Sequence, residues 1–163
     1  MQEIYLLLGS NLGDSLNYLQ KAFQLINTQI GPIEKYSSYY QTSAWGKSDQ
    51  PDFINQAISL KSSMPAMKLL NAIWSIEDNL DRKREERWGA RTMDIDIIFY
   101  GSEIINLPEL IIPHKLLHER RFVLMPLNEI APQFIHPALG KTVNQLLLEL
   151  TDDLSVRKLE KHN

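Results

Sequence analysis

Two aspartates, Asp94 and Asp96, are separated by one residue in a stretch of β-branched and aromatic residues, 94–100, that predicts a β-strand. Successive side chains of a strand point to opposite faces, so both carboxylates would share a face, starting about 6.6 Å apart. They can converge on one hard divalent cation, or on a pair of cations about 3.5–4 Å apart. Oxygen ligands suit magnesium or manganese and do not suit zinc. Three apolar residues would take the other face and pack in the core: Ile95, Ile97 and Phe99.

The two aspartates could instead belong to the solvated face of a half-buried sheet. The segment just before them, residues 81–91, favours a functional role for the two aspartates over a solvated sheet face. It holds five cationic side chains: Arg82, Lys83, Arg84, Arg87 and Arg91. A divalent cation beside guanidinium groups is what polyphosphate transfer needs, because charge on the transferring group must be neutralised as it moves. With Trp88 in the same segment, the combination indicates a nucleotide-type site.

Length and charge limit the kind of protein. The 163 residues are enough for one domain with a full core, and we expect a single domain over 1–163. The net charge is −3, and residues 81–91 carry five basic and three acidic side chains, so the rest of the chain carries −5. One basic segment on an acidic body argues against a nucleic-acid surface and suits a small anionic ligand better.

The chain has no cysteine, which excludes a disulfide framework, a thiolate zinc site and a cysteine nucleophile. The N-terminus lacks a basic region followed by a long apolar run, so no secretory signal is expected. The longest apolar runs are far too short to span a membrane. These features predict a cytoplasmic protein without a membrane partner.

Hydrophobic periodicity and turn residues predict the elements that position the acidic pair. The expected order is strand 3–8, a helix from Asp14 to Gly31, a strand within 33–45, an antiparallel strand 53–62, a helix opened by Pro65, and strand 94–100. Residues 101–112 should be irregular, and short helices should follow at 116–124, 126–132 and 143–150, before a frayed end. This order predicts an α+β fold, a split β-α-β arrangement with an antiparallel sheet and helices on one face.

Four other features allow more than one interpretation. The glycine turn after the first strand has neither G-x-G-x-x-G nor G-K-[ST], which favours a tight turn over a phosphate loop. Glu77 faces inward in the apolar stripe of its helix, where it is either paired with an arginine or functional. Asn55 could present its amide to a heterocycle, although an ordinary polar role is the commoner one. His114 after Pro113 is either structural or a phosphate ligand.

Taken together, several stretches resemble the 6-hydroxymethyl-7,8-dihydropterin pyrophosphokinase family of folate biosynthesis. The matching stretches are Gly9-Ser10-Asn11-Leu12-Gly13, Asp49-Gln50-Pro51-Asp52-Phe53-Ile54-Asn55, Arg87-Trp88-Gly89-Ala90-Arg91-Thr92-Met93-Asp94-Ile95-Asp96-Ile97, Pro113-His114, and Arg120 with Phe122. They run in the right order, and the Trp-Gly-x-Arg-x-x-Asp-x-Asp segment is highly specific. The resemblance implies a ferredoxin-like fold. Departures from the family pattern are Phe53, Trp74 and Lys115, where tyrosine, glutamine and an aromatic residue are common.

The resemblance also implies an activity and a set of roles. Pyrophosphate would pass from ATP to the pterin's hydroxymethyl group by in-line attack at the β-phosphorus, releasing AMP, with two Mg²⁺ ions held by Asp94 and Asp96. Catalysis would use Arg82, Arg91, Asp94 and Asp96. ATP would be bound by Glu77, Arg84, Arg87, Ile97, His114 and Arg120. The pterin would be bound by Thr42, Ser43, Ala44, Trp45, Phe53, Asn55, Trp88 and Phe122. Both partners are small molecules, and a monomer is expected.

Two other functions fit part of the sequence. A ferredoxin-like RNA-binding module could use Tyr39, Tyr40 and the basic residues of 82–91, since such modules stack bases on sheet aromatics. They do not need paired aspartates, and the acidic body counts against this function. A metal-dependent phosphohydrolase could use the same two aspartates.

Overall fold

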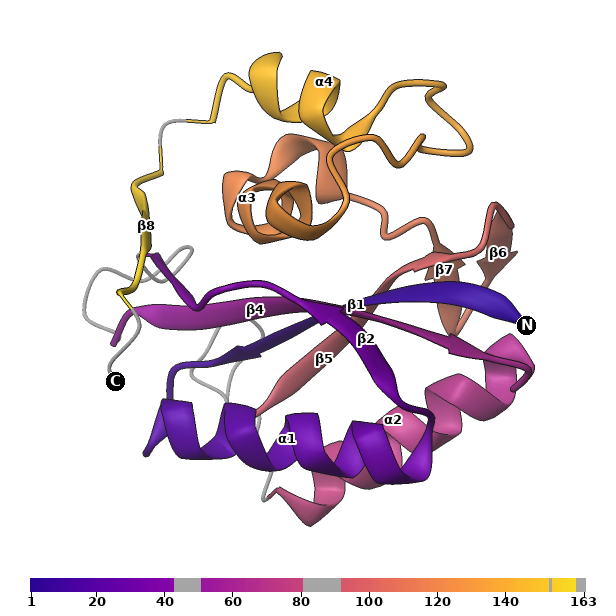
Figure 1. The fold of residues 1–163 in the computed structure, drawn as a ribbon, viewed down its shortest axis with the longest axis vertical. Helices are drawn as coiled ribbons and strands as arrows, with labels where there is room; N and C mark the ends of the chain where they lie inside the picture. The colour runs from indigo at the N-terminus through magenta and orange to yellow at the C-terminus, as the bar shows by residue number, and fades with distance from the viewer. Residues whose placement is uncertain (43–50, 81–91, 153, 161–163) are drawn as a thin grey trace.

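The computed structural model describes residues 1–42, 51–80, 92–152 and 154–160. In these residues an antiparallel sheet lies between two layers of helices (Figure 1). The strand order is β5-β1-β4-β3-β8, and β2 also pairs with β4. The sheet strands are β1 (Gln2–Ser10), β2 (Ile33–Tyr36), β3 (Tyr40–Thr42), β4 (Phe53–Ser62), β5 (Asp94–Tyr100) and β8 (Val156–Lys158). The arrangement confirms the expected α+β fold with an antiparallel sheet.

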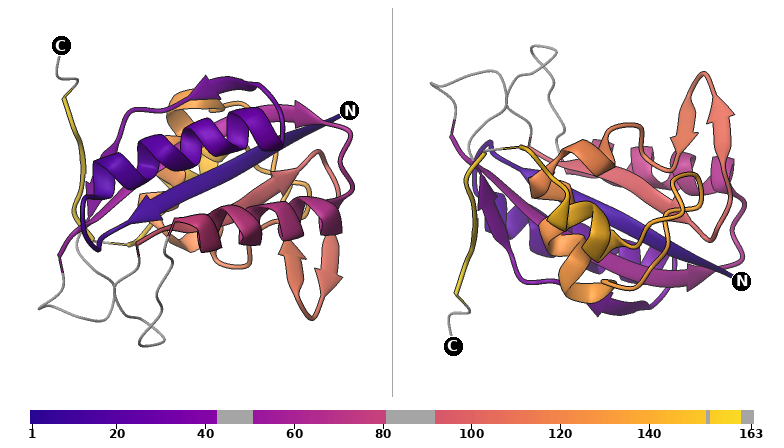
Figure 2. Two further views of the ribbon diagram at one scale, coloured as in Figure 1. Left: turned by 90° about the horizontal axis from the view of Figure 1, so that it is seen from below. Right: turned by 90° about the horizontal axis from the view of Figure 1, so that it is seen from above.

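One face of the sheet is covered by α1 (Ser15–Gln29) and α2 (Ala66–Asn79), which lie side by side over the strands (Figure 2). Asp14 caps α1 as predicted, because its side chain accepts a hydrogen bond from the Asn17 N–H at 3.2 Å. Pro65 stands at the N-cap of α2, one position earlier than expected. The predicted apolar stripe of α2 is buried against the sheet: Leu69, Leu70, Ile73, Ile76 and Leu80.

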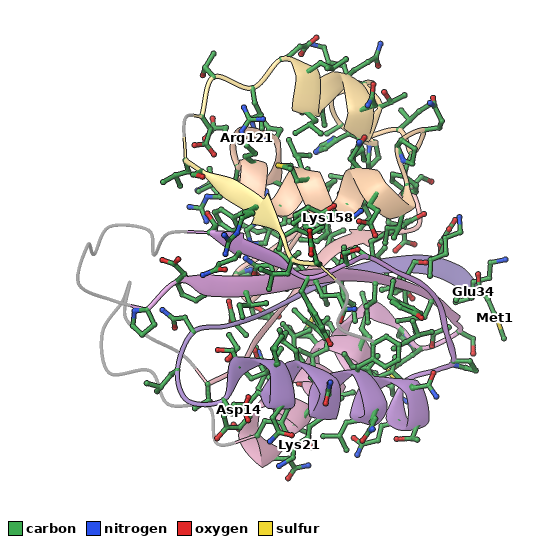
Figure 3. The ribbon with its side chains drawn as sticks, turned by 60° about the vertical axis from the view of Figure 1, so that its left-hand side comes forward. Met1, Asp14, Lys21, Glu34, Arg121 and Lys158 are labelled. Atoms are coloured by element: carbon green, nitrogen blue, oxygen red, sulfur yellow. The ribbon has the colours of Figure 1, made fainter. Side chains whose placement is uncertain are left out.

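The other face is also covered, by α3 (Arg121–Ile130) and α4 (Val143–Leu148). The expectation of helices on one face only is therefore wrong. The reason is that the strands carry apolar side chains on this face too: Tyr5, Leu7 and Ala57 are buried against Val123, Leu124 and Leu127 of α3. Burying them requires a second layer of helices. Side chains fill the space between the layers, and Lys158 lies where β8 approaches α3 (Figure 3).

A register shift in β5 moves Phe99 to a face that simple alternation does not predict. Leu6 of β1 pairs with Ile97, whereas the preceding Tyr5 pairs with Phe99, so the ladder passes over Ile98. Ile95 and Ile97 pack against the α1–α2 layer as expected, but Phe99 packs on the opposite side. There its ring lies edge-on to that of Tyr5, with centroids 5.9 Å apart. The bulge leaves the two aspartates before it undisturbed.

The later part of the chain is more ordered than predicted. Residues expected to be irregular form a hairpin of β6 (Ile105–Leu107) and β7 (Leu110–Ile112), which projects beside α2 (Figure 2). The two short helices expected at 116–132 are a 3₁₀ turn, η1 (Leu117–Glu119), and a single helix α3 that runs through Pro126. The end expected to fray contains β8, which pairs with β3. No helix of the described residues is long and apolar enough to cross a membrane.

Candidate functional site

A row of residues across three strands defines the floor of the candidate site. Gly9 of β1 lies directly between Asn55 of β4 and Asp94 of β5. Residues paired across an antiparallel ladder share a face, so the amide and the carboxylate point to the same side of the sheet. A Cβ at Gly9 would stand 2.5 Å from Asn55 Oδ1. Because glycine has no side chain, the space between these two polar side chains stays open.

Asp96 lies on the same face as Asp94, as the sequence predicts. It is paired with Leu7, whose side chain packs on the α3–α4 side, while Ile95 and Ile97 pack on the other side. Both aspartates are partly exposed. Carboxylate oxygens that share a face and reach solvent fit a hard divalent ion such as Mg²⁺. In the described residues no three or more His, Asp or Glu side chains are arranged so that they could hold a metal ion by themselves, so substrate and water oxygens would have to complete a coordination shell.

Glu77 holds the main chain between the two aspartates. This glutamate is 3% exposed, and its Oε2 accepts a hydrogen bond of 2.9 Å from the N–H of Ile95. β5 is the outer strand of the sheet, so the N–H that Glu77 binds belongs to its free edge. The inward orientation expected for Glu77 is confirmed. Its contact with Ile95 holds the strand in place between the two aspartates.

His114 lies beside the acidic pair. The Nε2 of His114 is 4.0 Å from Asp96 Oδ2, and its main-chain N–H binds the Ile98 carbonyl at 3.2 Å. Burial, with the charge of Arg120, lowers the pKa of His114 below its usual 6.5, although Asp94 opposes this. The imidazole is therefore neutral near neutral pH. The Arg120 guanidinium carbon lies 5.7 Å from the centroid of the Phe122 ring.

A pocket of about 350 Å³ opens at the outer edge of β5, between α2 and the β6–β7 hairpin. Volumes of this order are typical of small-molecule sites. Its wall contains the acidic pair, His114 and Glu77, together with apolar surface from Trp74 and Ile97. Five of the residues expected at a nucleotide and metal site are thus brought together: Glu77, Asp94, Asp96, Ile97 and His114.

The residues expected to bind a pterin lie further along the same face. Thr42 of β3 pairs with Phe53 of β4, two residues before Asn55. Asn55 is 4% exposed, and its Nδ2 is buried without a hydrogen-bond partner among the described residues. An unpaired buried amide donor is costly unless a ligand satisfies it. This favours a binding role for Asn55 over an ordinary polar one.

The turn after β1 connects to both segments that border the site. The Ser10 hydroxyl donates a hydrogen bond to the carbonyl of Thr92, and Asn11 Nδ2 donates to the carbonyl of Pro51 at 3.0 Å. Ser10 and Asn11 are almost fully buried. The sequence predicted only a tight turn here. Distant parts of the chain bury Ser10 and Asn11, so the local sequence could not have predicted these contacts.

Part of the expected site falls outside the described residues. This holds for Arg82, Arg84, Arg87, Trp88 and Arg91 of the basic segment, and for Ser43, Ala44 and Trp45 of the segment that follows Thr42. The described chain resumes at Thr92 and at Pro51, where Ser10 and Asn11 hold it. Both of these anchors lie beside the row of Asn55, Gly9 and Asp94.

The fold and the site together define a class of protein. A ferredoxin-like antiparallel sheet that carries paired carboxylates beside a pocket of small-molecule size is an arrangement found in enzymes that act on small ligands. The family model of 7,8-dihydro-6-hydroxymethylpterin-pyrophosphokinase matches residues 5–132. The chain belongs to this family, which confirms the resemblance seen in the sequence.

Relatives and solved structures agree with this assignment. The chain is 42% identical to the 2-amino-4-hydroxy-6-hydroxymethyldihydropteridine pyrophosphokinase of Synechocystis over 86% of this chain and 72% of that protein. It is 38% identical to the enzyme of the same name from Aquifex aeolicus, over 93% and 94% of the two chains. The wild-type HPPK-DHPS of Plasmodium falciparum, crystallised with pteroate, superposes with a TM-score of 0.75 at 18% identity. The match covers 91% of this chain and 42% of that longer chain, and supports the fold alone.

Proposed function

We propose that this chain transfers the terminal pyrophosphoryl group of ATP to the hydroxymethyl oxygen of 6-hydroxymethyl-7,8-dihydropterin, releasing AMP. Its membership of the pyrophosphokinase family supports the reaction class. The observation that carries the proposal is the row of Asn55, Gly9 and Asp94. It sets a buried, unpaired amide and an acidic pair on one face of the sheet, which supports a heterocycle bound at the first and a polyphosphate bound at the second.

The nucleotide would lie in the pocket at the edge of β5. Trp74 and Ile97 offer apolar surface for a base, and the acidic pair stands at the end where phosphates would carry magnesium. A neutral His114 imidazole can donate one N–H to a phosphate oxygen, and the Arg120 guanidinium beside it can bind another. The arginines of 81–91, expected from the sequence to bind phosphates, would add positive charge to the same site.

Asp94 and Asp96 would hold the magnesium ions, and we expect two of them. When bound, such ions offset negative charge on the bridging and leaving oxygens of the triphosphate. The carboxylates themselves contribute by standing at fixed positions, because Glu77 ties the main chain between them. Preset positions avoid reorganisation during the reaction.

The pterin would lie over Gly9, with its amide and ring nitrogens facing Asn55. Phe53 and Phe122 provide aromatic surface for the flat heterocycle, and Thr42 lies opposite Phe53. The hydroxymethyl oxygen then forms a bond to the β-phosphorus while the bond from that phosphorus to the α–β bridging oxygen breaks. No strong general base stands out among the described residues, and a loose phosphoryl transition state needs alignment more than proton removal.

Product analysis tests this function. The chain is incubated with ATP and magnesium, with and without the hydroxymethyl-dihydropterin, and nucleotides are separated. We expect AMP in amounts equal to the pterin consumed, and none without pterin. Formation of ADP, or of AMP in the absence of pterin, would instead indicate a phosphohydrolase and overturn the proposal.

A further inference from the structure

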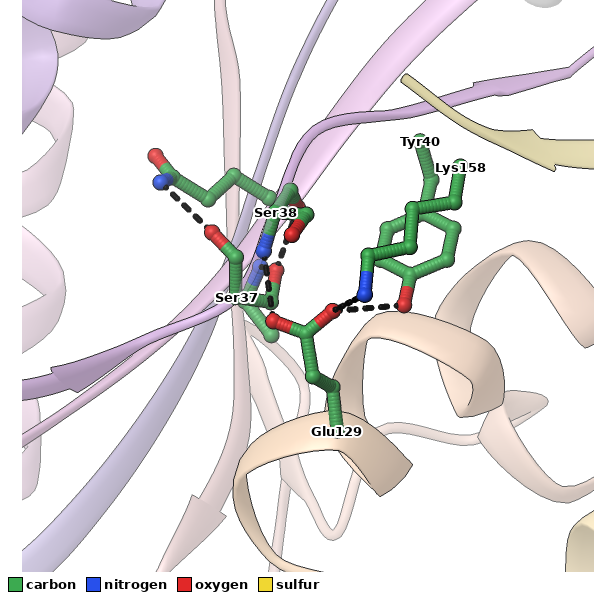
Figure 4. A network of polar contacts seen from close by, with 7 residues as sticks. Ser37, Ser38, Tyr40, Glu129 and Lys158 are labelled. Atoms are coloured by element: carbon green, nitrogen blue, oxygen red, sulfur yellow. Dashed lines mark hydrogen bonds and ion pairs between the residues drawn. The ribbon is translucent and has the colours of Figure 1, made fainter. Parts of the chain in front are cut away.

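One carboxylate of the α3 layer reaches across to the sheet and joins three separate elements. Glu129 on α3 accepts a hydrogen bond from the Tyr40 hydroxyl at 2.8 Å and one from the Ser38 N–H at 2.7 Å (Figure 4). Lys158 of β8 places its ammonium 3.2 Å from the same carboxylate. Glu129 is therefore held by the segment leading into β3, by β3 itself and by the C-terminal strand.

The elements that Glu129 joins are those that carry the proposed pterin residues. Tyr40 pairs directly with Asn55 across the β3–β4 ladder, and Thr42 follows two residues later on the same face. The helix α3 carries Phe122 in its first turn. In the proposed function the flat ligand lies between these sheet residues and Phe122. Glu129 is a direct polar link between the helix that carries Phe122 and the strand that carries Thr42.

The strand β8 reinforces the link at the point where β3 ends. β8 pairs with β3 along its full length, and the Thr42 hydroxyl donates to the carbonyl of Ser155 at 3.1 Å. A second chain of exposed hydrogen bonds joins side chains of β8, β3 and the residue before β4, because Arg157 donates to Gln41 at 2.8 Å and Gln41 donates to Asp52 at 3.0 Å. Asp52 directly precedes Phe53. β8 thus ties the last residues of β3 to the first residues of β4.

The negative charge of the Glu129 carboxylate strengthens the hydrogen bonds that join α3 to the sheet. Burial acts to raise the pKa of this carboxyl, but the hydrogen bonds from Tyr40, Ser38 and Lys158 outweigh it and leave the pKa below its ordinary value. Burial, together with the hydrogen bond to Glu129 and the negative charge of Glu129, raises the pKa of the Tyr40 hydroxyl. A charged acceptor and neutral phenol donor form the stronger type of hydrogen bond, which persists throughout the neutral range.

The pocket proposed for the nucleotide lies at the opposite edge of the sheet from β8. β5, whose edge lines the pocket with Glu77 and the acidic pair, is the first strand in the order, and β8 is the last. None of Glu129, Tyr40 or Lys158 lines that pocket. Loosening the Glu129 link should therefore disturb the pterin half of the site more than the nucleotide half, which α3 reaches only through Arg120 at its N-cap.

We infer that Glu129 and the C-terminal strand β8 position the pterin half of the site, by fixing the spacing between Phe122 on α3 and the Thr42–Asn55 surface of the sheet. This rests on the proposed function, since it assigns a ligand to that spacing. Glu129 and Lys158 act through other residues and are positioning residues, not catalytic ones.

The test separates the two substrates kinetically. Tyr40→Phe removes one donor to Glu129 and keeps the ring, and Glu129→Gln removes the charge and keeps the shape. We expect either variant to raise KM for the pterin about fivefold to tenfold, with KM for ATP and kcat changed less than about twofold. Lys158→Met should act in the same direction more weakly, because this lysine is 57% exposed, and Lys158→Arg should restore the wild-type value.

Lys141→Met is the matched control. It breaks a comparable exposed ion pair, Lys141 with Glu149 at 2.8 Å, beside α4 and away from β3 and β8. It should leave both KM values unchanged. Thermal unfolding of each variant is measured in parallel, and should Glu129→Gln fail to fold, Tyr40→Phe decides the question.

The inference is overturned if Tyr40→Phe changes neither KM, or raises both KM values equally. Wild-type turnover of pterin and ATP to AMP, measured first, tests the proposed function separately. An active wild type with unselective variants would remove only the positioning role, whereas an inactive wild type would remove the function itself.

Discussion

At the scale of single residues, the site depends on side chains whose positions are set by the main chain under them. Asp94 and Asp96 alternate with buried isoleucines, so neither can rotate to the other face without exposing apolar surface. Glu77 fixes the intervening N–H, and Gly9 leaves space beside Asn55. Two substitutions address these residues directly.

Asp96→Asn tests the acidic pair. The side chain is partly exposed and the replacement has nearly the same shape, so the fold should persist while one anionic ligand is lost. Loss of groups that merely support a metal ligand typically lowers activity 10- to 100-fold, so we expect a fall in kcat of more than about 100-fold here. Steady-state kinetics and thermal unfolding are compared with wild type. A near-normal kcat would contradict the metal role.

Gly9→Ala tests whether the space beside Asn55 must stay unfilled. The added Cβ would stand 2.5 Å from Asn55 Oδ1, so the Asn55 side chain must move. We expect weaker pterin binding, by about tenfold, since a misplaced amide loses its hydrogen bonds to the ring. Gly31→Ala is the control, because its Cβ would be 3.1 Å from the Lys61 carbonyl, away from the site. Equal pterin affinities in wild type and Gly9→Ala, measured by calorimetry, would exclude this role.

At the scale of elements, the local sequence pattern predicted the amphipathic helices. It missed the elements that form only by pairing with a distant strand. The apolar stripe of α2 and the Asp14 cap of α1 are carried by neighbouring residues, so the sequence alone shows them. The three-residue strand β8 is mostly polar and exists by pairing with β3, over a hundred residues earlier. The bulge that turns Phe99 is likewise set by its pairing with β1.

The candidate site likewise has one part that the local pattern predicts and another that depends on how distant strands pair. The acidic pair was predictable because strand alternation is local, and its shared face is confirmed. The row of Asn55, Gly9 and Asp94 comes from three strands, so their adjacency follows only from the strand order. The anchoring of Ser10 to Thr92 has the same origin, since the partners are 82 positions apart in the sequence.

Asp152→Ala tests how α3 begins. The helix has no cap from its own sequence, and Asp152, 31 residues later, accepts the Arg121 N–H at 3.0 Å through Oδ2. Removing this acceptor should lower the free energy of unfolding by about 1 kcal/mol, as for other helix caps. Asp152→Asn retains an acceptor oxygen and should lose less. Urea denaturation measures both, and an unchanged midpoint for Asp152→Ala would show that the contact does not stabilise α3.

At the scale of the whole molecule, the two proposed halves of the site lie next to each other on the face of the sheet that the α3–α4 layer covers. That layer contains a buried histidine, His136, whose Nδ1 accepts the N–H groups of Ala138 and Leu139, each at 3.1 Å. Burial, with the nearby His118, lowers the pKa of His136 below 6.5. Protonation of Nδ1 would remove both hydrogen bonds.

This arrangement sets the direction of the pH dependence of stability. Above pH 6.5 His136 is neutral in the folded and unfolded states, and its full contribution is present. As the pH falls below 6.5 the unfolded state takes up a proton first, so stability decreases until the pH passes the lower folded pKa. His114 acts in the same direction. We expect the melting temperature to fall between about pH 7.5 and pH 5.5.

His136→Asn isolates this contribution, since its amide oxygen can replace the Nδ1 acceptor and does not titrate. The variant should show a shallower decline in melting temperature over the same range, with the remainder due to His114. Identical slopes for wild type and variant would assign the decline to other groups.

The central claim is that Asp94 and Asp96 hold divalent ions against the triphosphate, and a crystal structure with magnesium and a non-hydrolysable ATP analogue tests it most directly. The account predicts magnesium within about 2.0–2.1 Å of carboxylate oxygens from both residues, with the phosphates on its far side. Ordered nucleotide with both carboxylates turned to solvent and no ion near them would contradict it.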